Sequence, residues 1–173
     1  VKVEIHSEKK DLNNKIIKEL KALVTRYENI FNLQNSHSEI CKLNKEKKLN
    51  NCSYELTDVI KKSLMISQMS EGSFDITVQP LWEYYYKNFI LEGSGTINQN
   101  EIRNILKTVN WKNVEVYENN INLKNNSSIT LNGIAQGFIT DQVVKLLKKY
   151  GIKNTLVDFG ENYALGLFRD QRS

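Results

Sequence analysis

Residues Ser128 to Asp141 read Ser-Ile-Thr-Leu-Asn-Gly-Ile-Ala-Gln-Gly-Phe-Ile-Thr-Asp, and this stretch decides the fold that we expect. The run from Ile129 to Leu131 predicts a short strand, the Asn-Gly pair breaks it, and a helical pattern of apolar residues begins at Ile134. Gly151 stands where a glycine would end that helix. A strand that turns at a glycine into a helix offers free backbone N–H groups to a phosphate. The same glycines also fit a plain tight turn, and both interpretations stay open on this stretch alone.

Apolar periodicity predicts the elements on either side of this stretch. Helices are expected at residues 11–31, 38–43, 57–71 and 98–109. The third of these is expected to begin with Thr57 as N-cap and to end at Gly72. Strands are expected at residues 1–5, 74–78, 155–159 and 163–167, and over 114–131 as a hairpin-rich sheet that turns at Asn119-Asn120. Helices and antiparallel hairpins interleave without a regular βαβ period. This order predicts an α+β fold, in one domain of 173 residues.

Composition and charge exclude several classes of function. The net charge of +4 is modest, and the densest basic run, Lys45 to Lys48, contains Glu46, so we interpret it as a solvated loop and not a nucleic-acid surface. No apolar run approaches the ~20 residues of a membrane span. The two histidines, His6 and His37, do not stand at ligand spacing to the two cysteines, which argues against a zinc site. Cys41 and Cys52 fit either one disulfide or two free thiols.

An aromatic cluster follows Pro80 and consists of Trp82, Tyr84, Tyr85 and Tyr86. Such a cluster fits packing in the core and also fits a platform on which a ring could stack. Both interpretations stay open.

Three further stretches carry recognisable motifs. Ser38-Glu39-Ile40 is followed by Leu43-Asn44, Glu71–Val78 is followed by Pro80-Leu81, and Leu156–Gly166 reads Leu-Val-Asp-Phe-Gly-Glu-Asn-Tyr-Ala-Leu-Gly. Together with Ser128–Asp141, they resemble in order and spacing the signature elements of the ApbE-like family, the FAD:protein FMN transferases. Four ordered matches across most of the chain are more specific than any one of them.

The resemblance implies a fold, an activity and partners. The implied fold is an α+β architecture with antiparallel sheets backed by helices, related to the T-fold and here truncated at the C-terminus. The implied activity is Mg²⁺-dependent cleavage of FAD, transfer of its FMN half to a threonine or serine hydroxyl of a target flavoprotein, and release of AMP. Family members continue well past the length of this chain, and the Asp and Thr that complete their magnesium site lie in that part. Many members are lipid-anchored outside a bacterial membrane, so an extracytoplasmic lipoprotein is expected.

The resemblance also implies site residues, whereas no residue is assigned as catalytic. The residues carried over as contacts to the flavin nucleotide are Gln34, Ser73, Phe74, Asp75, Thr130 and Gln136. The backbone carbonyl of Gly133 is carried over as a metal ligand. The alternative for the Ser73–Asp75 stretch is a turn with a buried Phe and an Asp that caps the next segment. We expect the turn before Ile134 to face the Phe74 region across one cleft, with the linked phosphates between them.

Several positions depart from the family pattern. Thr130 replaces an Asp and Gln136 replaces a Lys, so two partners for charge-assisted hydrogen bonds are lost. Gln34 cannot stack on a ring as Tyr or Trp would, and Glu161 replaces a glycine near the expected pyrophosphate. Two alternatives therefore stay open. One is a flavin-binding or scaffolding relative without transfer activity, and the other is an α+β interaction module that binds no flavin.

Overall fold

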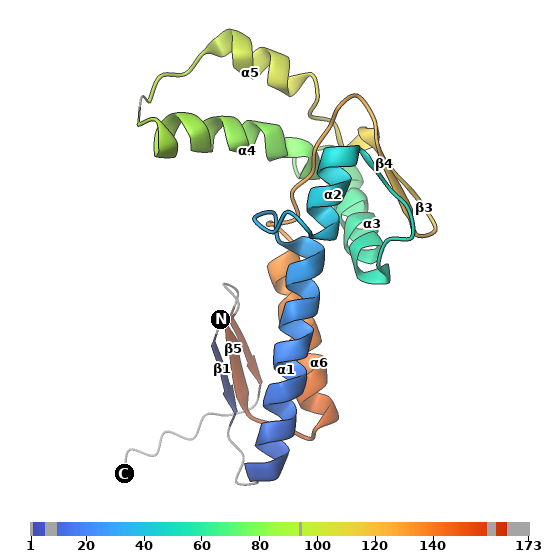
Figure 1. The fold of residues 1–173 in the computed structure, drawn as a ribbon, viewed down its shortest axis with the longest axis vertical. Coiled ribbons are helices and arrows are strands. Elements are labelled where there is room, and N and C mark those ends of the chain that lie inside the picture. Colours follow the sequence, from blue (N-terminus) through green and yellow to red (C-terminus); the bar gives the residue numbers. More distant parts are fainter. Residues whose placement is uncertain (1, 6–9, 94, 159–161, 166–173) are drawn as a thin grey trace. The chain divides into compact units, whose positions relative to one another are not determined.

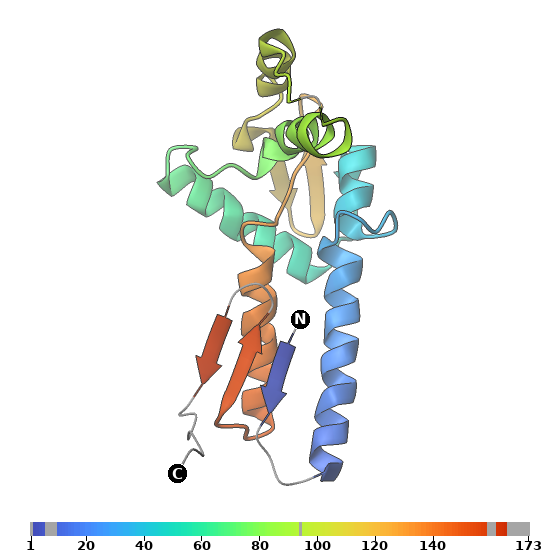
Figure 2. The same cartoon turned by 90° about the vertical axis from the view of Figure 1, so that its left-hand side faces the viewer.

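The computed structural model of the chain describes residues 2–5, 10–93, 95–158 and 162–165 (Figures 1 and 2). The chain divides into two compact units, which are described separately. The first unit consists of Val1–Glu28 and Asn132–Ser173, and the second is Asn29–Leu131. This division does not decide the expectation of a single domain over residues 1–173, which stays a prediction. No helix among the described residues is long and apolar enough to cross a membrane.

The first unit pairs two helices with a three-stranded sheet (Figure 2). It contains β1 (Lys2–Ile5), α1 (Lys10–Phe31) up to Glu28, α6 (Ala135–Lys149), β5 (Thr155–Asp158) and β6 (Asn162–Leu165). The strands lie in the order β1-β5-β6, and both pairs are antiparallel. Their shared core consists of Ile16, Leu20, Val143, Val144, Leu147, Ile152 and Val157. The predicted end of α6 is confirmed, since Gly151 has a φ of 73° and Ile152 N–H donates to the Leu147 carbonyl at 3.1 Å.

The second unit contains the remaining helices and a second antiparallel sheet in the order β2-β4-β3. Its α-helices are α2 (Glu39–Glu46), α3 (Tyr54–Met69), α4 (Gln79–Tyr85) and α5 (Gln99–Leu106), and α4 continues as a π-helical turn, Tyr86–Leu91. Its strands are β2 (Lys48–Leu49), β3 (Val114–Tyr117) and β4 (Asn120–Leu123), and 3₁₀ turns cover Ile76–Val78 and Trp111–Asn113. The predicted α+β class with small antiparallel sheets is confirmed.

The structure corrects four local predictions. Ile129–Leu131 belongs to no strand, because its backbone binds the Asn44 side chain and the Ile76 carbonyl of a 3₁₀ turn rather than a neighbouring strand. The predicted strand from Phe74 to Val78 is a turn that enters a 3₁₀ helix. Ser53, not Thr57, is the N-cap of α3, since its hydroxyl accepts the Leu56 N–H at 3.2 Å. The hairpin turns one residue earlier than expected, at positions 118–119.

The aromatic cluster does not join the core. Trp82, Tyr85 and Tyr86 are exposed, and the rings of Trp82 and Tyr86 stack with their centroids 5.0 Å apart. No described residue from Trp82 to Lys107 is buried. The interpretation of the cluster as core packing is therefore wrong for these described side chains.

Both cysteines are free thiols. Cys52 is 5% exposed, and its burial, together with the Glu39 carboxylate, raises the pKa of its thiol to about 11. Cys41 is half-buried at the start of α2, where its thiol lies 3.2 Å from the Leu33 carbonyl. The disulfide that the sequence left open does not form between these residues.

The difference in burial between Cys41 and Cys52 predicts selective alkylation. With a pKa of about 11, Cys52 has roughly 0.1% thiolate at pH 8, and only the thiolate reacts. Iodoacetamide at pH 8 should therefore label Cys41 in the native protein and Cys52 only after denaturation, as measured by peptide mass spectrometry. Equal labelling of both cysteines in the native state would contradict the burial of Cys52.

Candidate functional site

Asp75 lies at the centre of the turn that leads from α3 to α4, and both of its carboxylate oxygens accept hydrogen bonds. Oδ1 accepts the Thr77 N–H at 2.7 Å and the Thr77 hydroxyl at 2.6 Å, which makes Asp75 the N-cap of the 3₁₀ turn. Oδ2 accepts the Trp111 N–H at 2.9 Å, 36 residues along the chain. Thr77 is fully buried. The geometry thus gives Asp75 the capping role that the sequence analysis held as an alternative.

The segment Ser127–Leu131, which precedes α6 in the chain, is held by two side chains. One is Asn44 in α2, and the other is Lys47, the C-cap residue of α2. Asn44 binds Ile129 twice, since its Nδ2 donates to the Ile129 carbonyl at 2.8 Å and its Oδ1 accepts the Ile129 N–H at 2.7 Å. Lys47 Nζ donates to the Ser127 carbonyl at 2.9 Å and lies 2.7 Å from the Ser128 hydroxyl oxygen. Ile129 is fully buried, so these bonds satisfy backbone groups that water does not reach.

The next residue along this segment joins it to the Asp75 turn. Thr130 N–H donates to the Ile76 carbonyl at 2.8 Å. Two of the stretches that carry the resemblance, Glu71–Val78 and the start of Ser128–Asp141, therefore meet within the second unit. A third, through Asn44, binds the same segment. The structure brings Asp75 and Thr130 together in this way.

The other nucleotide-contact candidates of the second unit lie in turns. Ser73 is exposed and Phe74 is half-buried, and the Phe74 N–H donates to the Ser70 hydroxyl at 3.0 Å. Gln34 is exposed in the loop before α2, where its N–H donates to Asn32 Oδ1 at 2.8 Å. The roles of these three residues toward a flavin nucleotide stay predictions.

The remaining candidates belong to the first unit. Gly133 is exposed in the turn before α6, and Gln136 is exposed in the first turn of that helix. The N-cap residue Ile134 makes no side-chain hydrogen bond to the helix. The phosphate site at this turn, the metal role of Gly133 and the cleft shared with Phe74 stay predictions. Glu161 lies outside the described residues.

The described residues do not make up a magnesium site on their own. Within the described parts of the chain, no three His, Cys, Asp or Glu side chains converge as metal ligands would. The single carbonyl of Gly133 supplies one ligand at most.

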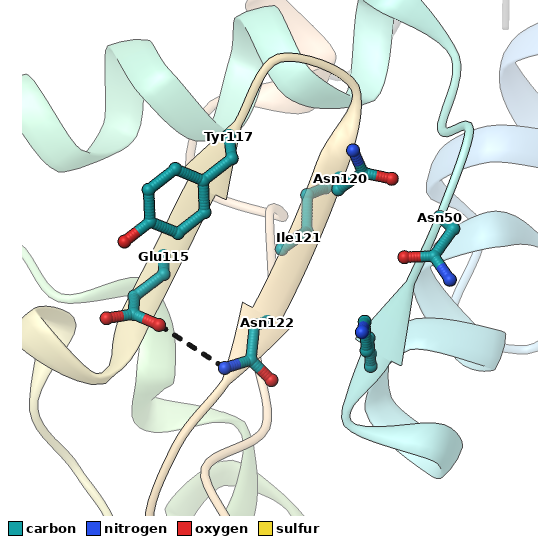
Figure 3. A pocket seen from close by; sticks show the side chains of 7 residues that line it. Asn50, Glu115, Tyr117, Asn120, Ile121 and Asn122 are labelled. Carbon is teal, nitrogen blue, oxygen red and sulfur yellow. Dashed lines mark hydrogen bonds between the residues drawn. The ribbon is translucent and has the colours of Figure 1, made fainter.

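A separate hollow of about 410 Å³ lies on the outer face of the β2-β4-β3 sheet (Figure 3). It is lined by Lys48, Asn50, Glu115, Tyr117, Asn120, Ile121 and Asn122. Asn122 Nδ2 donates to Glu115 at 3.3 Å, as Figure 3 shows. Lys124 also donates to Glu115, and these bonds lower the pKa of that carboxyl. None of the predicted site residues lines this hollow, so the hollow does not supply the expected site.

Sequence reasoning missed the two residues that hold the Ser127–Leu131 segment. Asn44 stood in a quoted motif without a role, and Lys47 was interpreted as part of a solvated loop. Lys45 and Lys48 are indeed exposed, but Lys47 is half-buried. Burial lowers the pKa of its ammonium group, while the Glu83 carboxylate acts in the opposite direction. No signal in the sequence pointed to Lys47, because the predicted helix ended at residue 43, whereas α2 continues to Glu46 and makes Lys47 its C-cap.

Comparison with solved structures and with protein families shows what this chain is similar to. Among solved structures, a mutant of the flavin transferase ApbE from Vibrio cholerae has a TM-score of 0.83 at 21% identity, over 97% of this chain and 59% of that chain. The apo form of the flavinyl transferase ApbE from Pseudomonas stutzeri has a TM-score of 0.79 at 19% identity, over 95% of this chain and 54% of that chain. The ApbE protein from Thermotoga maritima has a TM-score of 0.75 at 24% identity, over 90% of this chain and 51% of that chain.

These likenesses show the fold, since each identity is below 25%. This chain spans 51% to 59% of the length of those three structures. No curated protein matches the sequence. The profile of the ApbE family matches residues 1–173, and the chain therefore belongs to the ApbE family.

Proposed function

We propose that the full-length protein transfers the FMN half of FAD to a threonine or serine hydroxyl of a target flavoprotein. The observation that carries the proposal is the match of the ApbE family over residues 1–173. Two of the similar structures are named flavin or flavinyl transferases, which supports the same activity. FAD is then a substrate, and a flavoprotein is the partner.

The proposed step is a phosphoryl transfer that balances as follows. The acceptor hydroxyl oxygen forms a new bond to the phosphorus on the FMN side of the pyrophosphate, and the hydroxyl proton passes to the solvent. The bond from that phosphorus to the bridging oxygen breaks, and AMP departs with the bridging oxygen. Positioning and charge neutralisation supply most of the catalysis in such reactions.

In this proposal, the residues of this chain bind and orient the nucleotide. The contact between Thr130 N–H and the Ile76 carbonyl keeps the segment before α6 beside the Asp75 turn. Because one carboxylate oxygen of Asp75 accepts hydrogen bonds from Thr77 and the other accepts one from Trp111, we infer that Asp75 shapes the nucleotide site more than it binds the nucleotide. The Thr130 side chain is half-buried and neutral, so a bond from it to an uncharged group of FAD would lack charge assistance.

Magnesium dependence and an extracytoplasmic, lipid-anchored location are part of the same proposal. Both are supported by the resemblance of the motifs to the family. A bound Mg²⁺ would neutralise phosphate charge, and Mg²⁺ is usually held by few protein ligands together with substrate phosphates.

The transfer reaction is tested with the full-length protein. The protein, FAD, Mg²⁺ and a flavoprotein domain with one candidate acceptor threonine are mixed, and intact mass spectrometry follows the target. We expect the target to gain the mass of FMN minus water, AMP to appear in equal amount, and the gain to vanish when the acceptor is changed to alanine. Addition of EDTA should abolish the gain. No adduct on a target that a known family member modifies would contradict the proposal.

A second candidate function is flavin binding without transfer. It is favoured by Thr130 and Gln136, which stand in place of a carboxylate and an ammonium group. In the same experiment, retained FAD without an adduct supports this candidate. No change in flavin fluorescence and no shift of the melting temperature with FAD would instead support an interaction module that binds no flavin.

A further inference from the structure

The C-terminal end of α2 reaches a segment that begins 80 positions away in the sequence. Lys47 contacts Ser127 and Ser128 through its ammonium group at 2.9 and 2.7 Å. Its own carbonyl accepts the Leu123 N–H at 2.7 Å, so its backbone is anchored beside the end of β4. Both ends of the loop between β4 and the Ser127–Leu131 segment are thus tied to this one residue.

The backbone of Lys47 is unusual for a lysine. Its φ of 61° and ψ of −1° lie in the left-handed region, and its N–H donates to the Leu43 carbonyl at 2.8 Å to close the helix. Glycine is the usual residue at such a helix end, because a side chain there strains the backbone. Other non-glycine residues of the described chain, such as Glu71 after α3, also have positive φ, so the contacts of the ammonium group, and not the backbone alone, distinguish Lys47.

The bonds of this region form a continuous chain that ends at the Asp75 turn. Lys47 holds Ser127 and Ser128, Asn44 holds both backbone groups of Ile129, and the Thr130 N–H then reaches the Ile76 carbonyl. Ser127 is fixed further by its hydroxyl, which donates to the Thr108 carbonyl at 2.6 Å and accepts from Asn113 Nδ2 at 2.9 Å. Because consecutive residues are bound, a shift at Ser128 would move Thr130 out of register with Ile76.

We propose that Lys47 is a positioning residue, which acts through the Ser127–Leu131 segment to set Thr130 against the Asp75 turn for nucleotide binding. The proposal deepens the proposed function, since the use of this geometry by FAD rests on it. Lys47 itself contacts neither Asp75 nor Thr130 by any hydrogen bond that the structure shows among the described residues. Its effect is therefore exerted on the backbone and not on the nucleotide.

The test uses four variants of the full-length protein and two readouts. Lys47→Met keeps the length of the side chain without a donor, Lys47→Gly suits the left-handed helix end without a side chain, and Lys47→Arg keeps a donor. Lys45→Met is the matched control, because Lys45 is an exposed lysine in the last turn of the same helix. The first readout is hydrogen exchange of the Ile129 and Thr130 amides without flavin. The second is the transfer kinetics, from which KM for FAD and kcat are determined separately.

We expect the Met and Gly variants to exchange these two amides about tenfold faster than the wild type and to raise KM for FAD about tenfold, with a smaller change in kcat. Lys47→Arg should recover most of both effects, and Lys45→Met should leave both unchanged. A simple helix-capping role predicts instead that Lys47→Gly behaves like the wild type.

The two readouts distinguish whether Lys47 holds the Ser127–Leu131 segment from whether that segment matters for FAD binding. Unchanged exchange at Ile129 and Thr130 in Lys47→Met would overturn the proposal, and so would faster exchange with an unchanged KM for FAD. A wild-type protein that neither binds nor transfers flavin would overturn the proposed function and, with it, a role in nucleotide binding. The exchange data would still decide in that case whether Lys47 holds the segment.

Discussion

Asp75→Ala should lower the free energy of unfolding by about 2–4 kcal/mol, because one side chain supplies a helical cap and a long-range acceptor. The substitution leaves the Thr77 N–H and hydroxyl without their acceptor, and Thr77 is fully buried. It also removes the acceptor of the Trp111 N–H, which ties the turn to the segment before β3. Urea denaturation of the full-length protein, followed by circular dichroism, measures the change.

Two further variants show which bond matters. Asp75→Asn keeps one oxygen to cap Thr77 but presents an amide group to the Trp111 N–H, so we expect about half of the loss. Asp58→Ala is the matched control, because the half-buried Asp58 forms an i,i+4 pair with the exposed Lys62 at 2.7 Å, and removal of this pair should cost less than about 0.5 kcal/mol. If Asp75→Ala kept the stability of the wild type and only weakened FAD binding, the carboxylate would be a nucleotide contact and not a cap.

Asn44→Ala should have an effect of similar size, about 2–4 kcal/mol, since it leaves a buried N–H and a buried carbonyl unpaired. Both groups belong to Ile129, which is fully buried, so water cannot replace the lost amide without opening the segment. The same denaturation measurement applies, and hydrogen exchange at Ile129 should become faster in parallel.

The control for this change is Asn50→Ala, at an asparagine that is exposed after β2 and should tolerate the substitution within about 0.5 kcal/mol. Asn44→Asp offers the Ile129 N–H an acceptor but turns a second oxygen toward the Ile129 carbonyl, so it should recover the stability only in part. Equal stabilities of Asn44→Ala and Asn50→Ala would show that the segment does not depend on Asn44.

The sequence was sufficient for the features that depend on residues a few positions apart. Helical periodicity located α1, α5 and α6 to within a few residues, and Gly151 marked the end of α6. Alternation and turn residues located β3, β4, β5 and β6, and hence the α+β class. The four ordered motifs were sufficient for the family, because their residue types and spacing are themselves properties of the chain.

The tertiary structure alone decided how the candidate site is held. The β-branched residues of Ile129–Leu131 predict a strand by local preference. The hydrogen-bond partners of this run are instead the Asn44 side chain, 85 positions away, and the Ile76 carbonyl, and local preference contains no information about either. Asp75 likewise cannot be recognised as a cap for Trp111 until the fold brings position 111 beside the turn. Periodicity and propensity arise from neighbours within one or two turns, whereas these hydrogen bonds form only after distant segments have packed together.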